Sequence, residues 1–430
     1  MKILVVGGGG REHALVLALV RSPSVERVFC APGSDGIAAV AQCLPDLLTT
    51  HAEGIVAFAK SMAVDLVVIG PEAPRVAGLA DRLRAAGVSC FGPGADGARL
   101  EGSKSWAKSL MIRNNIPTAV HHTFTSAEEA KAFCTALETY PTVVKADGLA
   151  AGKGVTVCIS RSDALRAIGE AMEQRRFGDS GTTIVIEEFL RGEEVSVHAV
   201  TDGDTLLILP SAQDHKRVRD GDEGPNTGGM GAYSPAPVLT EKLLDVVVRT
   251  ILVPILHALK RESIEYRGVL YAGLMLTRSG PKVVEWNCRF GDPETQVILP
   301  RVRGDVAALL RAAADGRLCD VEGVDIDPRP VVGVVMASEG YPDAYKQGRA
   351  ITGIERAAAR PDVTVLHAGT RRKDGEWQTS GGRVLTVAAA GDDFRSARDR
   401  AYAAVADIRF EGEQHRTDIA RRVLEASAPR

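Results

Sequence analysis

The stretch VVKADGLAAGKGV, residues 143–155, places two short apolar runs on either side of a turn of small residues. It is not a Walker loop, because Gly148 and Gly152 are one residue too close and Gly154 replaces the Ser or Thr. A glycine loop between antiparallel strands can fold over a triphosphate with its amides pointing inward, and Lys145 adds a fixed positive charge. An unpaired ammonium inside an apolar strand would be costly. The stretch therefore predicts a strand–loop–strand phosphate site.

Downstream, IVIEEFLRGEE (184–194) indicates a strand that ends in a hinge. An adenine against such a hinge can use Glu187 for its exocyclic amine, the Leu190 amide for a ring nitrogen, and Glu194 for the ribose hydroxyls. The alternative is a solvated acidic strand edge, which is the commoner meaning of such a pattern taken alone. The interpretation as an adenine-binding hinge is strengthened only when this motif is considered together with the glycine loop.

The most specific pattern is VVEWNCRFGDPETQ (283–296). Glu285 and Asn287 are two apart on a predicted strand, so both side chains leave one face and can share a hard cation such as magnesium. Arg289 follows on the same face, where a guanidinium could stabilise charge on a carboxylate or a transferring phosphoryl group. A surface salt-bridge strand is the alternative, which the apolar VVEW context disfavours. Without a nucleophile–base pair, catalysis by positioning, metal and electrostatics remains.

At the N-terminus, an apolar run leads into GGGGREHAL (7–15). Glycines at a strand-to-helix turn let backbone amides approach a phosphate. A dinucleotide motif fails, because Glu12 stands where a third glycine is required and no acidic residue ends the second strand. Arg11 and His13 instead suggest a non-nucleotide phosphate or a sugar. The alternative is a tight turn with solvated charges.

The spacing of apolar runs predicts an α/β and α+β multidomain protein. Residues 1–100 alternate strands and helices, as in a small doubly wound parallel sheet. The strands are expected at 3–6, 25–30, 65–69 and 88–91, with helices after the glycine run and at 52–61 and 78–86.

Residues 101–325 form a second region that includes a mobile α+β lid at about 120–190. A helix over 101–116 carries Lys104, and residues 220–237 are so rich in Gly and Pro that an irregular functional loop is expected. Further elements are strands at 143–146, 155–159, 183–187, 270–276 and 282–286 and helices at 163–173 and 240–262. After a linker at 324–330, a small α+β domain over 326–430 is predicted, with strands at 331–337, 363–368 and 384–390 and a helix at 393–406.

Composition narrows the function classes. The 430 residues carry 52 Lys and Arg against 55 Asp and Glu, a formal charge of −3, which favours neither nucleic acid nor a membrane surface as partner. No apolar run approaches the roughly 20 residues of a membrane span. The seven cysteines are scattered without a CxxC pair, which indicates reduced thiols and a cytoplasmic protein.

Together, the glycine loop with Lys145, the hinge carboxylates and the Glu-x-Asn strand resemble ATP-grasp enzymes, in which ATP phosphorylates a carboxylate and an amine then displaces phosphate. Within that superfamily the chain resembles the phosphoribosylamine–glycine ligase family from Met1 to beyond Arg416. The resemblance rests on GGGGREHAL, GPEAP (70–74), LEGSK (100–104), KADGLAAGKGV, QDHKR (213–217), GPNTGGMGAYSP (224–235) and RFGDPETQ (289–296).

The resemblance implies a reaction of purine biosynthesis. Glycine would be activated as glycyl phosphate and attacked by the amine of 5-phosphoribosylamine, giving glycinamide ribonucleotide, ADP and phosphate. One or two Mg²⁺ or Mn²⁺ ions would assist, and a monomer or weak homodimer is expected. A third metal-side carboxylate common in the superfamily is missing, since Gly273 stands near its place, so fewer protein ligands are expected for the metal.

The resemblance also assigns residues. Lys145 and Arg289 would serve catalysis, with Arg289 facing the reacting phosphoryl or carboxylate group. ATP phosphates would be held by Lys104, Lys145, Ala151, Gly152, Lys153 and Gly154, adenosine by Glu187, Leu190 and Glu194, and the metal by Glu285 and Asn287. The ribose phosphate would lie among Gly9, Gly10, Glu72, Asp214, Asn226, Thr227 and Gly229.

Three alternatives stay open. Another ATP-grasp ligase, such as a carboxylase acting on a purine precursor or biotin, is disfavoured by RFGDPETQ. A nicotinamide-dependent oxidoreductase built on the first domain is disfavoured by the missing third glycine. A nucleotide-binding regulator without turnover is disfavoured because every motif that the reaction would use is intact.

Overall fold

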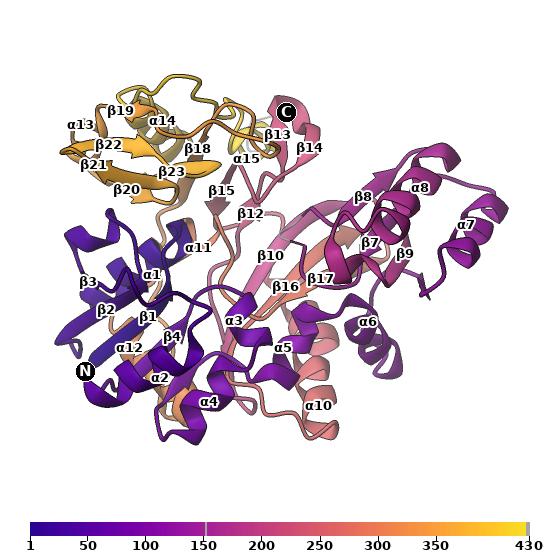
Figure 1. Cartoon of the computed structure of the whole chain (residues 1–430), viewed down its shortest axis with the longest axis horizontal. Coiled ribbons are helices and arrows are strands. Elements are labelled where there is room, and N and C mark those ends of the chain that lie inside the picture. Colours follow the sequence, from indigo (N-terminus) through magenta and orange to yellow (C-terminus); the bar gives the residue numbers. More distant parts are fainter. Residues whose placement is uncertain (151–152, 427–430) are drawn as a thin grey trace.

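The computed structural model of the chain describes residues 1–150 and 153–426. It has an N-terminal domain with a parallel sheet, a central region with antiparallel sheets and a C-terminal domain, each with its own core (Figure 1). The N-terminal and C-terminal sheets lie at one end of the molecule, and a smaller sheet that carries α7 and α8 lies at the other. Among the described residues no helix is long and apolar enough to cross a membrane.

The N-terminal sheet has five parallel strands in the order β3-β2-β1-β4-β5. Ile3 and Val5 of β1 face α1, whereas Leu4 and Val6 face α2 and α4, as expected for a strand buried on both sides. This confirms the doubly wound arrangement. The strands are β1 (Lys2–Gly7), β2 (Arg27–Pro32), β3 (Gln42–Cys43), β4 (Leu66–Ile69) and β5 (Cys90–Phe91), and the helices are α1 (Gly10–Val20), α2 (Ala52–Ser61), α3 (Ala73–Val76) and α4 (Leu79–Ala85).

A helix from much later in the chain completes the first face of this sheet. Leu309 and Leu310 of α12 (Val306–Asp315) belong to the same hydrophobic cluster as Ile3 and Val5. The N-terminal domain is thereby joined to the central region through its core.

The smaller sheet, here called the lid sheet, has the antiparallel order β6-β9-β7-β8. Its strands are β6 (His121–Phe124), β7 (Thr142–Ala146), β8 (Val155–Cys158) and β9 (Ile184–Glu188). One face packs on α7 (Ala127–Ala136) and α8 (Arg161–Ile168), and α8 continues into a π-helical turn at Gly169–Glu173. The predicted strand–loop–strand unit is therefore present as β7 and β8.

The central antiparallel sheet has the order β11-β10-β16-β17 and packs on α5 (Ala95–Gly102), α6 (Lys104–Arg113), α9 (Glu241–Val247) and α10 (Val253–Arg261). Its strands are β10 (Glu193–Thr201), β11 (Leu206–Ile208), β16 (Gly268–Thr277) and β17 (Gly280–Asn287). The predicted helix over 240–262 is α9 (Glu241–Val247), a π-helical turn at Val248–Leu252 and α10 (Val253–Arg261).

The prediction of one helix over 101–116 is wrong. Helix α5 (Ala95–Gly102) ends and α6 (Lys104–Arg113) begins at Ser103, whose extended backbone breaks the helix. The hydroxyl of Ser103 accepts the Trp106 N–H at 3.2 Å, so a new N-cap forms there. Lys104 consequently opens a helix instead of lying within one.

The prediction that residues 220–237 form only an irregular loop is also wrong. This segment contains β14 (Glu223–Asn226), paired with β13 (Arg217–Arg219), and β15 (Gly231–Ser234). Strand β15 pairs with β18 of the C-terminal sheet, so these Gly-rich residues find a ladder partner about a hundred positions away, which local composition does not reveal.

The C-terminal sheet has the order β12-β15-β18-β23-β20 and packs on α13 and α14. Its elements are β12 (Gln213–Asp214), β18 (Val331–Ala337), β20 (Val363–His367), β23 (Arg383–Ala390), α13 (Ile354–Ala358) and α14 (Phe394–Val405). Beside it lie β19 (Ala350–Ile351), β21 (Thr370–Lys373), β22 (Glu376–Thr379), the short helix α11 (Thr295–Ile298) and α15 (Arg421–Ala426).

Candidate functional site

The glycine loop between β7 and β8 lies against the start of α6. Lys104 donates from Nζ to the Gly148 carbonyl at 3.1 Å, and the Lys104 amide donates to the Asp147 carbonyl at 3.0 Å. The Lys153 side chain is exposed, and the Gly154 carbonyl accepts the Ala146 amide at 2.8 Å. The predicted phosphate residues Ala151 and Gly152 lie outside the described residues.

Glu187 of β9 is the centre of a buried cluster. Its Oε2 pairs with Lys145 Nζ at 2.9 Å and with Lys108 Nζ at 3.1 Å, whereas its buried Oε1 has no partner. Burial would raise the pKa of Glu187, but Lys145 and Lys108 outweigh it and lower that pKa. Burial lowers the pKa of Lys108 to about 8. The free Oε1 is an acceptor available to an amine donor, in keeping with the predicted adenine contact.

The other predicted adenosine residues lie further along the hinge. Leu190 is half-buried between β9 and β10. Glu194 is the second residue of β10 and pairs through Oε2 with Lys216 Nζ at 2.8 Å. Burial would lower the pKa of Lys216, but Glu194, Asp214 and Glu285 raise it above its ordinary value. Any ribose hydroxyl at Glu194 would therefore share that carboxylate with a fixed cation.

Glu285 of β17 lies among cations from separate segments. Burial would raise its pKa, but the charges of Lys216, Lys145, Lys104 and Arg289 lower it. A carboxylate held ionised in this way is a suitable ligand for a hard cation that also binds phosphate.

The residues present fit a divalent metal. Glu285 and Asn287 both lie in β17, two residues apart, and supply hard oxygen donors. Gly273 faces Glu285 across the ladder, and a Cβ there would lie 3.2 Å from the Glu285 Cγ. The missing side chain leaves Glu285 uncrowded. Within the described part of the chain, no three His, Cys, Asp or Glu side chains cluster as a metal site, so phosphate oxygens would have to complete the coordination.

Asp214 of β12 is a predicted substrate residue that interacts electrostatically with this cluster. Burial, helped by the charges of Glu294, Glu194 and Glu285 and opposed by Lys216, raises its pKa to about 7. Asp214 can therefore take up or release a proton near neutral pH.

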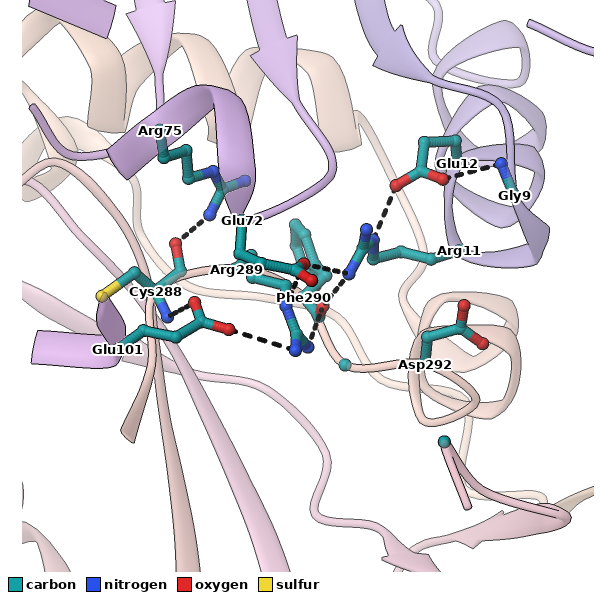
Figure 2. A network of polar contacts seen from close by, with 12 residues as sticks. Gly9, Arg11, Glu12, Glu72, Arg75, Glu101, Cys288, Arg289, Phe290 and Asp292 are labelled. Carbon is teal, nitrogen blue, oxygen red and sulfur yellow. Dashed lines mark hydrogen bonds and ion pairs between the residues drawn. The ribbon is translucent and has the colours of Figure 1, made fainter. Parts of the chain in front are cut away.

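Arg289 meets two carboxylates rather than open space, as Figure 2 shows. Its Nη2 pairs with Glu101 Oε1 at 3.1 Å and its Nε lies 3.3 Å from Glu72 Oε2. Burial would lower the pKa of Arg289, but Glu101 and Glu72 raise it above its ordinary value. Strand β17 ends at Asn287, so Arg289 lies beyond the strand and not on its face as predicted. The structure nevertheless brings Arg289 and Glu72 together.

Glu12 explains why the glycine turn is not a dinucleotide site. Its Oε2 accepts the Gly9 N–H at 2.8 Å and its Oε1 pairs with Arg11 Nε at 2.6 Å. A Cβ on Gly7 or Gly70 would collide with the Glu12 side chain, at 2.5 and 2.1 Å. An internal carboxylate thus occupies the space and the amide that a dinucleotide phosphate would need, and only Gly10 of the predicted pair keeps its amide clear of Glu12.

The loop after β14 reaches the segment that carries Arg289. Thr227 donates to the Lys216 carbonyl at 2.9 Å and accepts the Gly229 N–H at 2.9 Å. Gly229 has φ +112°, and a Cβ there would lie 2.3 Å from Pro293 Cδ, so the loop can approach this closely only as glycine. Asn226 is less central, ending β14 opposite Arg217.

Four polar residues of the site were not predicted. Lys108, Glu101 and Lys216 lie within or beside the quoted motifs LEGSK and QDHKR, which was the available signal. No sequence signal pointed to Arg383. From β23 it donates to the Gly228 and Asp292 carbonyls at 2.6 and 2.9 Å. The partners of these four residues are far away in the sequence, so only the folded structure reveals the contacts.

A strand-based hairpin, a hinge carboxylate and a Glu-x-Asn strand around a lysine-rich site define an ATP-grasp protein. Family models match all three domains: "Phosphoribosylglycinamide synthetase, N domain" over residues 1–101, its "ATP-grasp (A) domain" over 102–295 and its "C domain" over 331–422. The chain belongs to the phosphoribosylglycinamide synthetase family, whose members are ATP-dependent ligases that form a carbon–nitrogen bond in purine biosynthesis.

Similar proteins agree with this family. A phosphoribosylamine–glycine ligase of Rhodopirellula baltica is 51% identical over 427 residues, 98% of both chains. The trifunctional purine biosynthetic protein adenosine-3 of Gallus gallus is 48% identical over 424 residues, 98% of this chain and 42% of that protein. The crystal structure of the phosphoribosylamine–glycine ligase of Thermotoga maritima superposes with a TM-score of 0.82 at 33% identity, covering 98% of this chain and 100% of the other.

Proposed function

We propose that this chain ligates glycine to 5-phosphoribosylamine, using ATP to form glycyl phosphate and releasing ADP and phosphate with glycinamide ribonucleotide. The main observation in support of this proposal is a cluster in which the charges of Lys104, Lys145, Lys216 and Arg289 all lower the pKa of the Glu285 carboxylate. Cationic side chains from four separate segments thus converge on one place, which suits a triphosphate and its transferring phosphoryl group.

The proposed residue roles are those that the family resemblance implies. Lys104 and Lys145 bind phosphates together with Ala151, Gly152, Lys153 and Gly154 of the glycine loop. Glu187 receives the adenine amine on its free Oε1, Leu190 and Glu194 complete the adenosine site, and Arg289 faces the reacting carboxylate or phosphoryl group. The ribose phosphate lies among Gly9, Gly10, Glu72, Asp214, Asn226, Thr227 and Gly229, where the amide of Gly9 itself is taken by Glu12.

Glu285 and Asn287 hold one or two Mg²⁺ or Mn²⁺ ions. A bound ion would neutralise phosphate charge and orient the transferred group. The chain itself supplies the orienting cations and excludes water by closing the lid sheet over the nucleotide. The proposed domains are 1–100, 101–325 and 326–430, in a cytoplasmic monomer or weak homodimer. Biotin carboxylases share the fold at 15% identity, a likeness that concerns the fold alone.

Replacing Glu285 tests the metal assignment. In Glu285→Ala we expect kcat to fall by about 100-fold or more, because a lost metal clamp removes several kcal/mol of transition-state stabilisation. Titration with Mn²⁺ in the presence of ADP, followed by electron paramagnetic resonance, should show weaker Mn²⁺ binding in the variant. Near-normal turnover and unchanged Mn²⁺ binding in a folded variant would remove Glu285 from the site.

A further inference from the structure

Glu101 is a buried carboxylate that the predicted site does not include. It lies in the last turn of α5, three residues before Lys104, and its side chain is 8% exposed. Its two oxygens have different partners: Oε2 accepts the Cys288 N–H at 2.8 Å, and Oε1 pairs with Arg289 Nη2 at 3.1 Å. Figure 2 shows Glu101 reaching both consecutive residues from one side.

Both contacts fall where the chain has just left a strand. Strand β17 ends at Asn287, so its ladder no longer fixes Cys288 and Arg289. One contact of Glu101 holds the backbone and the other holds the guanidinium. Glu101 is therefore the side chain that contacts both the backbone just before Arg289 and its guanidinium, while Arg75 donates to the Cys288 carbonyl and Arg289 Nη1 donates to the Phe290 carbonyl.

The second carboxylate at Arg289 is held less firmly. Glu72 is 28% exposed on its side chain and meets Arg289 Nε as an ion pair at 3.3 Å, whereas Glu101 is 8% exposed and is also anchored by the Cys288 N–H. Its other cation, Arg11, is 4.0 Å away. An arriving substrate anion could displace Glu72 from Arg289 and leave the Glu101 contact intact.

The negative charge of Glu101 also acts on nearby cations. Arg75, Lys104 and Arg289 come from three separate segments, and the Glu101 charge acts on each of them. Arg75 is 1% exposed and donates to the carbonyls of Cys288 and Ile69. Removing the charge of Glu101 would take an anionic neighbour from each of these three cations.

We infer that Glu101 is a positioning residue that aims Arg289 at the reacting group, while Glu72 is the exchangeable partner. This rests on the role proposed for Arg289. Glu101 itself does not need to touch substrate.

Glu101→Gln is the first test, because glutamine has the same shape and can still accept the Cys288 N–H. We expect kcat to fall by about 10- to 100-fold, as for a misaimed catalytic group, with the KM for ATP within about threefold of wild type. The matched control is Glu262→Gln, a carboxylate in an exposed pair with Arg113, which should leave both constants unchanged. An unchanged kcat in Glu101→Gln would overturn the inference.

A double-mutant cycle with Arg289→Ala separates positioning from a general structural role. If Glu101 acts through Arg289, Glu101→Gln should have no further effect in the Arg289→Ala background. Multiplying effects would overturn the inference. Near-normal turnover of Arg289→Ala alone would instead refute the role proposed for Arg289, so the two failures are distinguishable.

Glu101→Asp keeps the test valid if the glutamine variant does not fold. Aspartate retains the charge beside Arg75 and Lys104, but its shorter side chain cannot hold both Cys288 and Arg289. A folded Glu101→Asp with a kcat reduced by about tenfold or more would support positioning. Wild-type kcat in that variant would contradict it.

Discussion

Individual side chains in this site have pKa values that differ from those they would have in water. Asp214 is the clearest case, because burial and three nearby carboxylates raise its pKa from 3.8 to about 7. The protonated acid is therefore favoured by the fold, and the stabilisation present below about pH 4 is lost as the pH rises towards 7.

Asp214→Asn removes this titration while keeping a similar shape. We expect the variant to gain stability relative to wild type as the pH is raised, so that its Tm advantage is larger at pH 8 than at pH 5. Differential scanning calorimetry at the two pH values measures the difference. An equal Tm difference at both would show that the pKa of Asp214 is not raised.

The pairing of site residues could be predicted only where it is local. Glu285 and Asn287 are found from their spacing of two, because a strand puts such residues on one face. Lys108 and Glu187 lie far apart in sequence, and their contact depends on how α6 packs against the lid sheet. Neither residue type nor spacing contains that information.

Among the elements, the break between α5 and α6 matters most for the site. Ser103 caps α6, and its hydroxyl donates to Asp147 Oδ2 at 3.1 Å, while the Ser105 amide donates to Asp147 Oδ1 at 2.5 Å. These contacts join the start of α6 to the glycine loop. The orientation of Lys104 therefore depends on a helix cap.

Ser103→Ala should lower the free energy of unfolding by about 1 kcal/mol, the usual effect of removing a serine N-cap. The KM for ATP should also rise several-fold, because Lys104 is the first residue after the cap. Ser126→Ala is the control, since Ser126 caps α7 on the far side of the lid sheet. Urea unfolding and ATP saturation curves measure both effects, and an equal KM change in the two variants would contradict this account.

The sequence predicts elements with strong periodicity well and misjudges those that depend on partners. Helix α2 and strand β18 have the predicted bounds, because their apolar patterns are regular. Strand β15 was missed because its stability comes from pairing with β18 and not from its own Gly-rich residues. The break at Ser103 was missed because Asp147 helps to fix it.

At the scale of the whole molecule, the N-terminal and C-terminal domains meet through two buried histidines. The His367 amide donates to His13 Nδ1 at 2.9 Å, and the two rings lie 5.7 Å apart. Burial lowers the pKa of both to about 4; the charge of His367 lowers the pKa of His13 as well, whereas Glu355 and Asp35 oppose the shift at His367. The stability that depends on neutral rings is complete above about pH 6.5 and is lost as the pH falls towards 4.

His13→Asn keeps an acceptor for the His367 amide and removes one titrating ring. We expect its Tm to fall less than that of wild type between pH 7 and pH 5, although buried His198 and His215 will still contribute to the fall. His257→Asn, at an exposed position of α10, is the control and should behave like wild type. An identical loss of Tm in all three proteins would contradict the coupling at this interface.

The three-domain architecture could be predicted from the order of strand and helix patterns, but the contacts between domains could not. The packing of α12 on the N-terminal sheet joins segments about 300 residues apart. Arg383 likewise brings the C-terminal domain to the loops at Gly228 and Asp292. Such contacts follow from tertiary packing, which the periodicity of the sequence does not reveal.

Dependence of phosphate release on each substrate tests the central claim most directly. With ATP and Mg²⁺ present, we predict that phosphate appears only when glycine and 5-phosphoribosylamine are both added, and in equal amount to glycinamide ribonucleotide. Steady phosphate release without glycine, or release that depends on bicarbonate instead, would contradict the proposed ligation.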